Sequence, residues 1–415
     1  MAHATAWFRG ETSGMTLQEI YKKNRFRRFP QTSFTFALDS LIHASASCKL
    51  PATKMSTALP KTMRAARLMK FSERYELQEI PVPEFGDNDL LIKVGAAGFC
   101  HTDYQVWTGT YQSPLPITPS HEPVGTVVAV GEKAAQGNWR VGQRVGLLNF
   151  KHACGSCTGC TYSKKAAGSD RPDIVVCQKK EMAGISHDGG FAEYMVADAE
   201  TTSILPDNLP FEQAAPLMCA GATVWSGIEH AELPSGSPVA VIGIGGLGQL
   251  AVQFLKALGH PVVAIDNRSE GLALAQELRT AALRPDAVID YSREDAAEKV
   301  VEFAGDDGGV AGVIVCTDNV EATEWSLKVL RVRGVCVPLG LPEAGFHFNA
   351  FDLVFKELKV VGSLVANKKQ LDAMLQVVDK HGIWSYVNTV AFEDVPRLPE
   401  LYMDKHLKGR LVLKM

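Results

Sequence analysis

Three residues far apart in the chain, Cys100, His121 and Cys219, have the side chains that a catalytic zinc ion prefers. Catalytic zinc takes three protein ligands and keeps a fourth position open, and two thiolates with one imidazole form a known set of this kind. An isolated Cys or His is more often a packed core residue. The prediction of one shared zinc site therefore depends on all three residues converging.

Two acidic residues stand next to these candidate ligands, Asp103 and Glu122. Histidines that bind metal usually donate a hydrogen bond from the N–H of their other ring nitrogen to a carboxylate or carbonyl group. We expect Asp103 to orient the imidazole of His121 and Glu122 to lie behind the ligands. The site would then bind an alcohol oxygen and lower the pKa of its hydroxyl group, as zinc does for water.

A glycine-rich segment, Gly243 to Gly248, follows the apolar run 239–242 and precedes a helical pattern. Gly243 allows a tight turn, Gly245 lets the backbone approach a pyrophosphate, and Gly248 lets helix and strand pack closely. The helix N-terminus offers free N–H groups to the phosphates. We expect Gly246 and Leu247 to line the same cofactor site; the alternative is a purely structural glycine turn.

Asp266 ends the next apolar run, 21 residues after Gly245. An acid at this place can bind both ribose hydroxyls of a dinucleotide, and its charge disfavours a 2′-phosphate. The pattern therefore predicts NAD as the cofactor. Arg268 is close enough to pair with a phosphate, which leaves NADP as the alternative.

Four further cysteines form a compact set, Cys154, Cys157, Cys160 and Cys177. Four thiolates close a tetrahedral structural zinc site with no open position. The polar stretch 161–176, which contains Pro and Gly, is expected to protrude as a loop, and loop length costs little free energy. The alternative is a lost site with free or redox-active thiols.

The bulk composition limits the classes of function. The 415 residues are enough for two domains, and 46% hydrophobic with 21% charged residues is typical of a globular protein. A net charge of −4 argues against nucleic acid, and no apolar stretch is long enough to cross a bilayer. Nine cysteines, an odd number, argue against a disulfide framework and for metal binding in a reduced compartment.

The pattern of strands and helices predicts an α/β protein. From residue 63, short strand-like runs separated by Pro and Gly indicate a β-rich domain, and from residue 239 apolar strands alternate with helices, as in a buried parallel sheet. The last helix and strand are expected to return to the first domain. The expected strands are 90–94, 125–130, 144–148, 239–242, 262–265, 287–289, 310–315, 335–339 and 411–414, and the expected helices are 246–258, 295–303 and 369–380.

Residues 1–62 differ from the rest, with nine Lys and Arg residues against three Asp and Glu. This composition resembles a transit peptide, but Glu11 and Glu19 fit it poorly. We favour a disordered extension, or initiation at Met55 or Met63, and hence a cytoplasmic protein. A mitochondrial protein is the alternative, if the extension directs transport.

Residues 63–415 resemble the zinc-dependent alcohol dehydrogenases of the medium-chain dehydrogenase/reductase superfamily, especially microbial and fungal members. The motifs that carry the resemblance occur in the family's order: 100–103, His121-Glu122, the cysteine set, 188–194, 218–224 and 243–248. The resemblance implies a GroES-like catalytic domain at 63–207, a Rossmann domain at 208–360, and a C-terminal return at 361–415. It also implies a homo-oligomer, a dimer or a tetramer.

The resemblance also implies roles for single residues. Cys100, His121 and Cys219 would bind the catalytic zinc, His101 would contact the cofactor pyrophosphate, and Thr102 would hydrogen-bond the alcohol and pass on its proton. The chain departs from the family at Ser120, where glycine is common, and at Gln105, where many members have a relay histidine. It also has Gly271 where a positive residue is common, so Arg268 or Lys368 would supply positive charge.

The sequence thus predicts an enzyme with two zinc ions per subunit that interconverts a small-molecule alcohol and an aldehyde or ketone with NAD. Three alternatives remain: a reductase that prefers NADP, a zinc-free quinone or enone reductase, and a catalytically silent nucleotide-binding protein. The metal-binding cysteines argue against the zinc-free reductase. The four aromatic or sulfur-containing residues Tyr104, Trp107, Tyr111 and Met218 either line the substrate pocket or belong to the general core.

Overall fold

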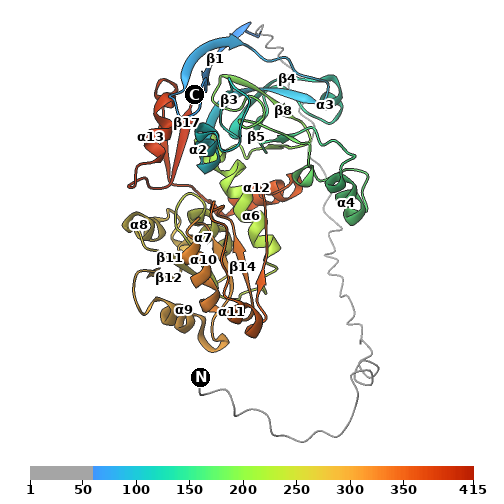
Figure 1. Ribbon diagram of the computed structural model, residues 1–415. Coiled ribbons are helices and arrows are strands. Elements are labelled where there is room, and N and C mark those ends of the chain that lie inside the picture. The colour runs from blue at the N-terminus through green and yellow to red at the C-terminus, as the bar shows by residue number, and fades with distance from the viewer. Residues whose placement is uncertain (1–58) are drawn as a thin grey trace, which may run out of the picture. The chain divides into compact units, whose positions relative to one another are not determined.

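Residues 59–415 are described by the computed structural model, and two large sheets organise them (Figure 1). Most of the expected extension, residues 1–58, lies outside the described residues. Residues 59–62 are described, and Thr62 already begins the first strand. No helix within residues 59–415 is long and apolar enough to span a bilayer.

The first sheet has seven strands, in the order β16-β17-β3-β4-β5-β9, with β8 beside β3. Its central antiparallel pair is β3 with β4, in which Gly98 faces Glu122. The end of β3 therefore lies beside the start of β4, and Cys100 and His121 emerge at the same edge. The strands are β3 (Asp89–Phe99), β4 (Glu122–Val130), β5 (Arg144–Leu147), β8 (Tyr194–Asp198), β9 (Thr202–Ile204), β16 (Val387–Val390) and β17 (Arg410–Lys414).

The second sheet has six parallel strands, in the order β12-β11-β10-β13-β14-β15. The strand order reverses between β10 and β13, and ligands bind at such switch points in doubly wound sheets. The strands are β10 (Val239–Ile242), β11 (Val262–Asp266), β12 (Ala287–Asp290), β13 (Val310–Val315), β14 (Leu330–Pro338) and β15 (Lys359–Val360). The helices linking them are α7 (Gly248–Ala257), α8 (Ser269–Glu277), α9 (Ala296–Ala304), α10 (Val320–Ser326) and α11 (Ala350–Phe355).

Two helices lie between the sheets, α6 (Ala220–His230) and α12 (Lys368–His381) (Figure 1). One hydrophobic core includes Ala96 and Val124 of the first sheet together with α6, α7 and the strands of the second. Because this core is continuous, the N-terminus of α6 is held firmly at the junction. Cys219 stands immediately before α6, so the third candidate ligand is placed between the sheets.

The remaining elements are short. They are the strand pairs β1 (Thr62–Arg67) with β2 (Glu76–Pro81) and β6 (Phe150–Lys151) with β7 (Glu181–Met182), and the helices α2 (His101–Thr108), α3 (Glu132–Gln136), α4 (Thr158–Ala167), α5 (Phe211–Ala214) and α13 (Leu398–Tyr402). Six 3₁₀ turns complete the part of the chain that the structure describes, at Ile174–Val176, Ala215–Met218, Ala281–Leu283, Gly305–Asp307, Leu327–Val329 and Phe392–Arg397.

Several elements differ from the sequence prediction. Strand β14 begins at Leu330, five residues before the expected 335, and β4 begins at Glu122 and not at 125. Strand β3 continues to Phe99, five residues beyond the expected end. Gly95 and Gly98 lie within it and have no room for a side chain, because a Cβ would collide with the Phe211 ring or the Glu122 carboxylate.

The stretch 161–176 is mostly exposed up to residue 171, as expected, but it is not a loop throughout. Helix α4 runs through Ala167, and the Ile174 and Val175 side chains pack into the main core.

Candidate active site and zinc centres

The side chains of Cys100, His121 and Cys219 meet at one point. Cys100 Sγ lies 3.3 Å from His121 Nε2, and one ligand atom from each of the three residues, together with a Glu122 oxygen, lies within 4.8 Å of the others. All three residues line one cavity of about 930 Å³. Two sulfur atoms and one imidazole nitrogen at this spacing fit a zinc ion.

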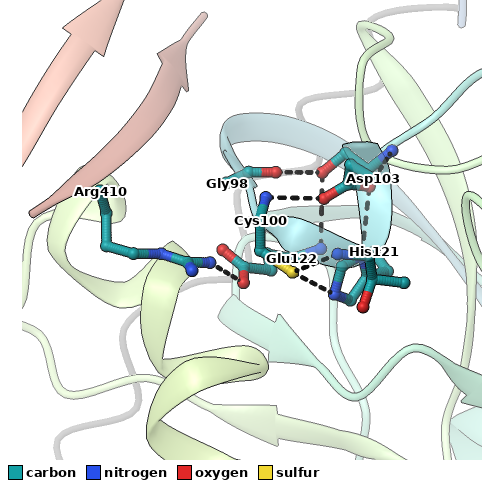
Figure 2. A network of polar contacts seen from close by, with 8 residues as sticks. Gly98, Cys100, Asp103, His121, Glu122 and Arg410 are labelled. Atoms are coloured by element: carbon teal, nitrogen blue, oxygen red, sulfur yellow. Dashed lines mark hydrogen bonds and ion pairs between the residues drawn. The ribbon is translucent and has the colours of Figure 1, made fainter. Parts of the chain in front are cut away.

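Asp103 fixes the segments that carry two of these ligands (Figure 2). Its carboxylate accepts hydrogen bonds from the backbone N–H of Cys100 (2.9 Å) and of Ser120 (3.1 Å), and lies 3.1 Å from His121 Nδ1. Because Nδ1 is occupied in this way, His121 presents Nε2 to Cys100. Asp103 is fully buried, so few competing partners exist.

The electrostatics of this centre favour a cation. Burial lowers the pKa of His121, but the charges of Asp103 and the two thiols outweigh burial and raise it well above its ordinary value. Burial raises the pKa of Cys100, but the contacts with Cys219 and His121 lower it by more. The pKa of this thiol is therefore well below its ordinary value. Contact with Cys100 and burial raise the pKa of Cys219 well above its ordinary value, so the two thiols do not both ionise readily on their own. A divalent metal would stabilise both as thiolates.

Glu122 lies closer to the ligands than the sequence suggested. Its carboxylate forms a buried ion pair with Arg410 of β17 (Figure 2), while Oε2 has no hydrogen-bond partner. Burial raises the pKa of Glu122 to about 7, although Arg410 acts in the opposite direction. The unpaired oxygen is a fourth potential donor within reach of a metal.

Ser120 adopts an unusual backbone conformation next to His121. Its φ is +78°, in the left-handed region that favours glycine, and the residue is fully buried. The hydroxyl donates a 2.8 Å hydrogen bond to the Gly98 carbonyl. The glycine common in the family is therefore replaced by a serine that gains one hydrogen bond.

The glycine segment forms a tight turn at the N-terminus of α7. Gly243 has a φ of +86°, and a Cβ on Gly248 would collide with the Gly243 carbonyl. Gly243, Gly245, Gly246 and Leu247 line the same cavity as the three metal-binding candidates. The space beside Gly246 is closed by the Arg410 side chain.

Asp266 ends β11 beside this turn, as a ribose-binding acid requires. Its carboxylate accepts hydrogen bonds from the backbone N–H of Ile244 (2.6 Å), Asn267 (2.8 Å) and Arg268 (2.9 Å). Arg268 Nε lies 3.5 Å from the same carboxylate, and its side chain borders the cavity. Gly271 leaves room for the carboxylate, since a Cβ there would collide with it.

The four remaining candidate cysteines form a second cluster. One sulfur each from Cys154, Cys157, Cys160 and Cys177 lies within 4.8 Å of the others. Backbone N–H groups point at the sulfurs, including those of Cys157 and Gln178 at 3.4 Å. Hydrogen bonds from the backbone lower the pKa of Cys154 to about 6, whereas burial raises that of Cys160 to about 12. Four converging sulfurs fit a structural zinc ion.

Comparisons with known proteins agree with this geometry. The family model of the alcohol dehydrogenase GroES-like domain matches residues 86–207, and that of the zinc-binding dehydrogenases matches residues 246–380. An alcohol dehydrogenase of Geobacillus stearothermophilus is 34% identical over 355 residues, which cover 85% of this chain and 100% of the relative. The chain belongs to the zinc-dependent alcohol dehydrogenases.

Solved structures of this dehydrogenase family have the same fold. The acetophenone reductase of Geotrichum candidum in complex with NAD is 26% identical, covers 86% of this chain and 98% of its own, and has a TM-score of 0.72. A Sinorhizobium meliloti protein assigned as a zinc-binding dehydrogenase, bound to NADP, is 26% identical over 86% and 100% of the two chains, with a TM-score of 0.73. This dehydrogenase is thus an alcohol and carbonyl oxidoreductase that uses zinc and NAD or NADP.

Several residues of the dehydrogenase cavity were not found from the sequence. Arg410 and Tyr402 line the cavity, but they lie about 190 residues after Cys219 and belong to no recognisable sequence motif. The one sequence feature that could have indicated Arg410 is an arginine within an apolar strand near the C-terminus, where the structure buries it. Tyr111 and Met218 line the cavity, whereas Tyr104 and Trp107 do not border it and pack against the core of the first sheet.

Lys368 also lies away from the cavity. Its ammonium pairs with Asp372 at 2.7 Å on the surface of α12. Lys405, which precedes β17, borders the cavity instead. The Lys and Arg residues that border the cavity are Lys180, Arg268, Lys405 and Arg410.

Proposed function

We propose that this chain oxidises an alcohol with NAD at the cavity shared by the three metal-binding candidates and the glycine segment. The observation that carries the proposal is that the three metal-binding candidates line one cavity together with most of the glycine segment, although they come from different parts of the chain. These residues are Cys100, His121, Cys219, Gly243, Gly245, Gly246 and Leu247. A zinc ion held by the first three would supply Lewis acidity, which lowers the pKa of an alcohol hydroxyl.

The residues around this centre have separate tasks. Thr102 stands two residues after Cys100 and borders the cavity, so its hydroxyl can accept the proton of the alcohol. His101 begins α2 and faces the cofactor side, where its Nδ1 lies 3.3 Å from the Tyr402 hydroxyl. That contact would hold the imidazole toward the pyrophosphate. Asp103 keeps the ligands in place, as its three contacts indicate.

We propose NAD as the preferred cofactor because Asp266 occupies the ribose position. A 2′-phosphate would approach a carboxylate that is 6% exposed and already bonded to three N–H groups. Arg268 acts in the opposite direction, since its guanidinium could pair with that phosphate. The ratio of kcat/KM with NAD to that with NADP should fall in Asp266→Asn and rise in Arg268→Ala.

A kinetic screen of alcohols and aldehydes, with zinc measured in parallel, tests the proposal. We expect turnover in the wild type and none in Cys100→Ala, while NAD binding by calorimetry stays within about threefold, because the glycine segment is untouched. Cys336→Ala is the matched control, since this buried thiol borders neither cluster. Unchanged kcat in Cys100→Ala, or NAD binding without any turnover in the wild type, would contradict the proposal.

We also propose that the chain self-associates. In α11 the Phe351, Val354 and Phe355 side chains are 66 to 73% exposed, and the two rings stack at 4.6 Å. An exposed apolar patch of this kind is typical of an interface. Light scattering should report a dimer or tetramer for the wild type and a smaller species for Phe351→Ser/Phe355→Ser; identical masses would contradict this surface.

The cellular compartment is a further proposal. Six cysteines in two candidate metal-binding clusters must stay reduced to bind zinc, which favours the cytoplasm. A tag fused to the C-terminus of the full chain would report the location. Import into mitochondria with loss of the first 62 residues would support the alternative.

A further inference from the structure

Lys180 differs from the other positively charged residues that border the cavity. Arg268 and Arg410 each face a carboxylate, and Lys405 is exposed to solvent. Lys180 is only half-exposed, and its ammonium forms no ion pair with any carboxylate of residues 59–415. Charged groups that are partly withdrawn from water are usually paired with an opposite charge. The cavity therefore contains one positive charge that a bound anion would neutralise.

The ammonium of Lys180 is held in place by neutral groups. Its Nζ donates hydrogen bonds to the backbone carbonyls of Val175 (2.9 Å) and Cys177 (3.1 Å), and it lies 4.9 Å from the centre of the Phe150 ring. An ammonium has three N–H donors, so one remains after these two carbonyls. Carbonyls and a ring face fix the position of a cation, but they bring no negative charge to it.

The strand pair β6–β7 separates Lys180 from the acidic residue beside it in the sequence. Phe150 pairs with Met182 in this ladder, and both border the cavity together with Lys180. Side chains alternate between the two faces of a strand, so Lys151 and Glu181 lie on the opposite face. There the two charges pair with each other at 3.5 Å. Glu181 is thus used by another lysine, and Phe150, Lys180 and Met182 form one wall of the cavity.

This wall lies on the side of the cavity that holds the metal-binding candidates. The chain continues from β7 to Gly184, which lies so close to Ser120 that a Cβ would come within 2.7 Å of the Ser120 backbone. Further along, the Gly190 N–H donates a 2.8 Å hydrogen bond to the Ser120 carbonyl. Ser120 directly precedes His121, whereas the ribose-binding candidate Asp266 lies in the parallel sheet. A substrate whose hydroxyl reaches the metal-binding candidates can therefore extend along this wall.

We propose that Lys180 binds a carboxylate at the far end of the substrate, so that the enzyme acts on alcohols and aldehydes that carry an acid group. This inference rests on the proposed function and names a substrate class for it. A single ammonium matches the one charge of a carboxylate, whereas a phosphate monoester would bring about two. The buried side chains of Phe150, Ile185 and Met218 also border the cavity and suit a hydrocarbon part between hydroxyl and acid.

The test compares para-(hydroxymethyl)benzoate with the neutral para-isopropylbenzyl alcohol, which has a similar shape, at saturating NAD⁺. The readout is the ratio of kcat/KM for the acid to kcat/KM for the neutral alcohol. In Lys180→Met this ratio should fall about tenfold to a hundredfold, the range for a lost charge-assisted hydrogen bond. The loss should appear in KM for the acid, because the ammonium contacts a part of the substrate that does not react. A change in packing would affect both alcohols and cancel in the ratio.

Lys179→Met is the matched control. It removes the same charge from the neighbouring residue, which is exposed and does not border the cavity, so its ratio should equal that of the wild type. Two further variants keep a charge at position 180 and so serve even if Lys180→Met folds poorly. Lys180→Arg should still prefer the acid, whereas Lys180→Glu should prefer para-(aminomethyl)benzyl alcohol, which carries an ammonium group.

Several outcomes would overturn this assignment. An equal ratio in the wild type and Lys180→Met, or the same preference in Lys180→Arg and Lys180→Glu, would exclude Lys180 as a carboxylate site. An equal fall in Lys179→Met would assign the effect to the general charge of this region. A wild type that oxidises only the neutral alcohol would refute this inference and leave the proposed function intact, whereas one that binds NAD but oxidises no alcohol would refute the proposed function itself.

Discussion

Ser120 offers a sharp test of how the backbone at the metal site is held. Its φ of +78° costs a residue with a Cβ about 1–2 kcal/mol, while its hydrogen bond to the Gly98 carbonyl contributes about 1 kcal/mol. Ser120→Gly loses the hydrogen bond but relieves the strain, so its stability should stay within about 1 kcal/mol of the wild type. Ser120→Ala loses the hydrogen bond and keeps the strain.

Ser326 is the matched control for this comparison. It is also fully buried, and its hydroxyl also donates to a backbone carbonyl, that of Thr323 at 2.6 Å. Its backbone is in the right-handed helical region, with φ −56°, where glycine is about 1 kcal/mol less stable than alanine. The glycine variant should therefore be more stable than the alanine variant at position 120 and less stable at position 326. The two differences in the free energy of unfolding should together amount to about 2 kcal/mol.

Urea denaturation at fixed zinc and NAD concentrations measures this order, because bound ligands would otherwise shift the midpoints. If Ser120→Ala is at least as stable as Ser120→Gly, while Ser326 follows the helical order, the strain assigned to Ser120 is wrong. If glycine is the better residue at both positions, the two sites do not differ as the backbone angles indicate.

Two further predictions concern the cysteine cluster and a buried histidine. Cys177→Ala should reduce zinc, measured by mass spectrometry of the metal, by one ion per chain and leave the ion at Cys100 in place; unchanged zinc would exclude the cluster as a metal site. Burial lowers the pKa of His187 to about 4 from 6.5, so the folded state binds this proton less readily than the unfolded state. Stability from this residue is therefore complete above pH 6.5 and is lost as the pH falls toward 4, by up to about 3 kcal/mol. His187→Gln should show a shallower loss in urea titrations over that range, and parallel curves would contradict the assignment.

Much of the fold was predictable because its signals are local. Strand β10 is an apolar run that ends at the glycine segment, and β13 is an apolar run that begins directly after Gly309. The sequence therefore predicted the first and last residue of both strands. The two sheets also follow from the change between short strands and alternating strands and helices. Local patterns of this kind do not depend on where the chain goes afterwards.

The errors occur where distant contacts decide. The strand expected at 90–94 continues as β3 to Phe99, and Gly95 and Gly98 within it leave space that Phe211 and Glu122 occupy. Ile174 and Val175 lie in a polar stretch, but they are buried in a core built mostly from the second half of the chain. Only the packed fold shows which partners such residues meet.

The candidate site shows the same distinction between residues that local patterns reveal and residues that only distant contacts reveal. Cys100, His121 and Cys219 were identified from residue type and motif, although convergence in space could only be expected. Arg410 could not be identified, because its partner Glu122 lies 288 residues away and the strand around it is ordinary. Tyr111 was a candidate for the pocket, and the structure places it at the cavity.

Anomalous X-ray scattering at the zinc edge, from crystals of the full chain with NAD, tests the central claim most directly. The account predicts one peak bounded by Cys100 Sγ, His121 Nε2 and Cys219 Sγ, facing the cavity that holds the nicotinamide, and a second peak among the four clustered cysteines. Absence of the first peak, or a peak whose ligands do not include these three residues, would contradict it.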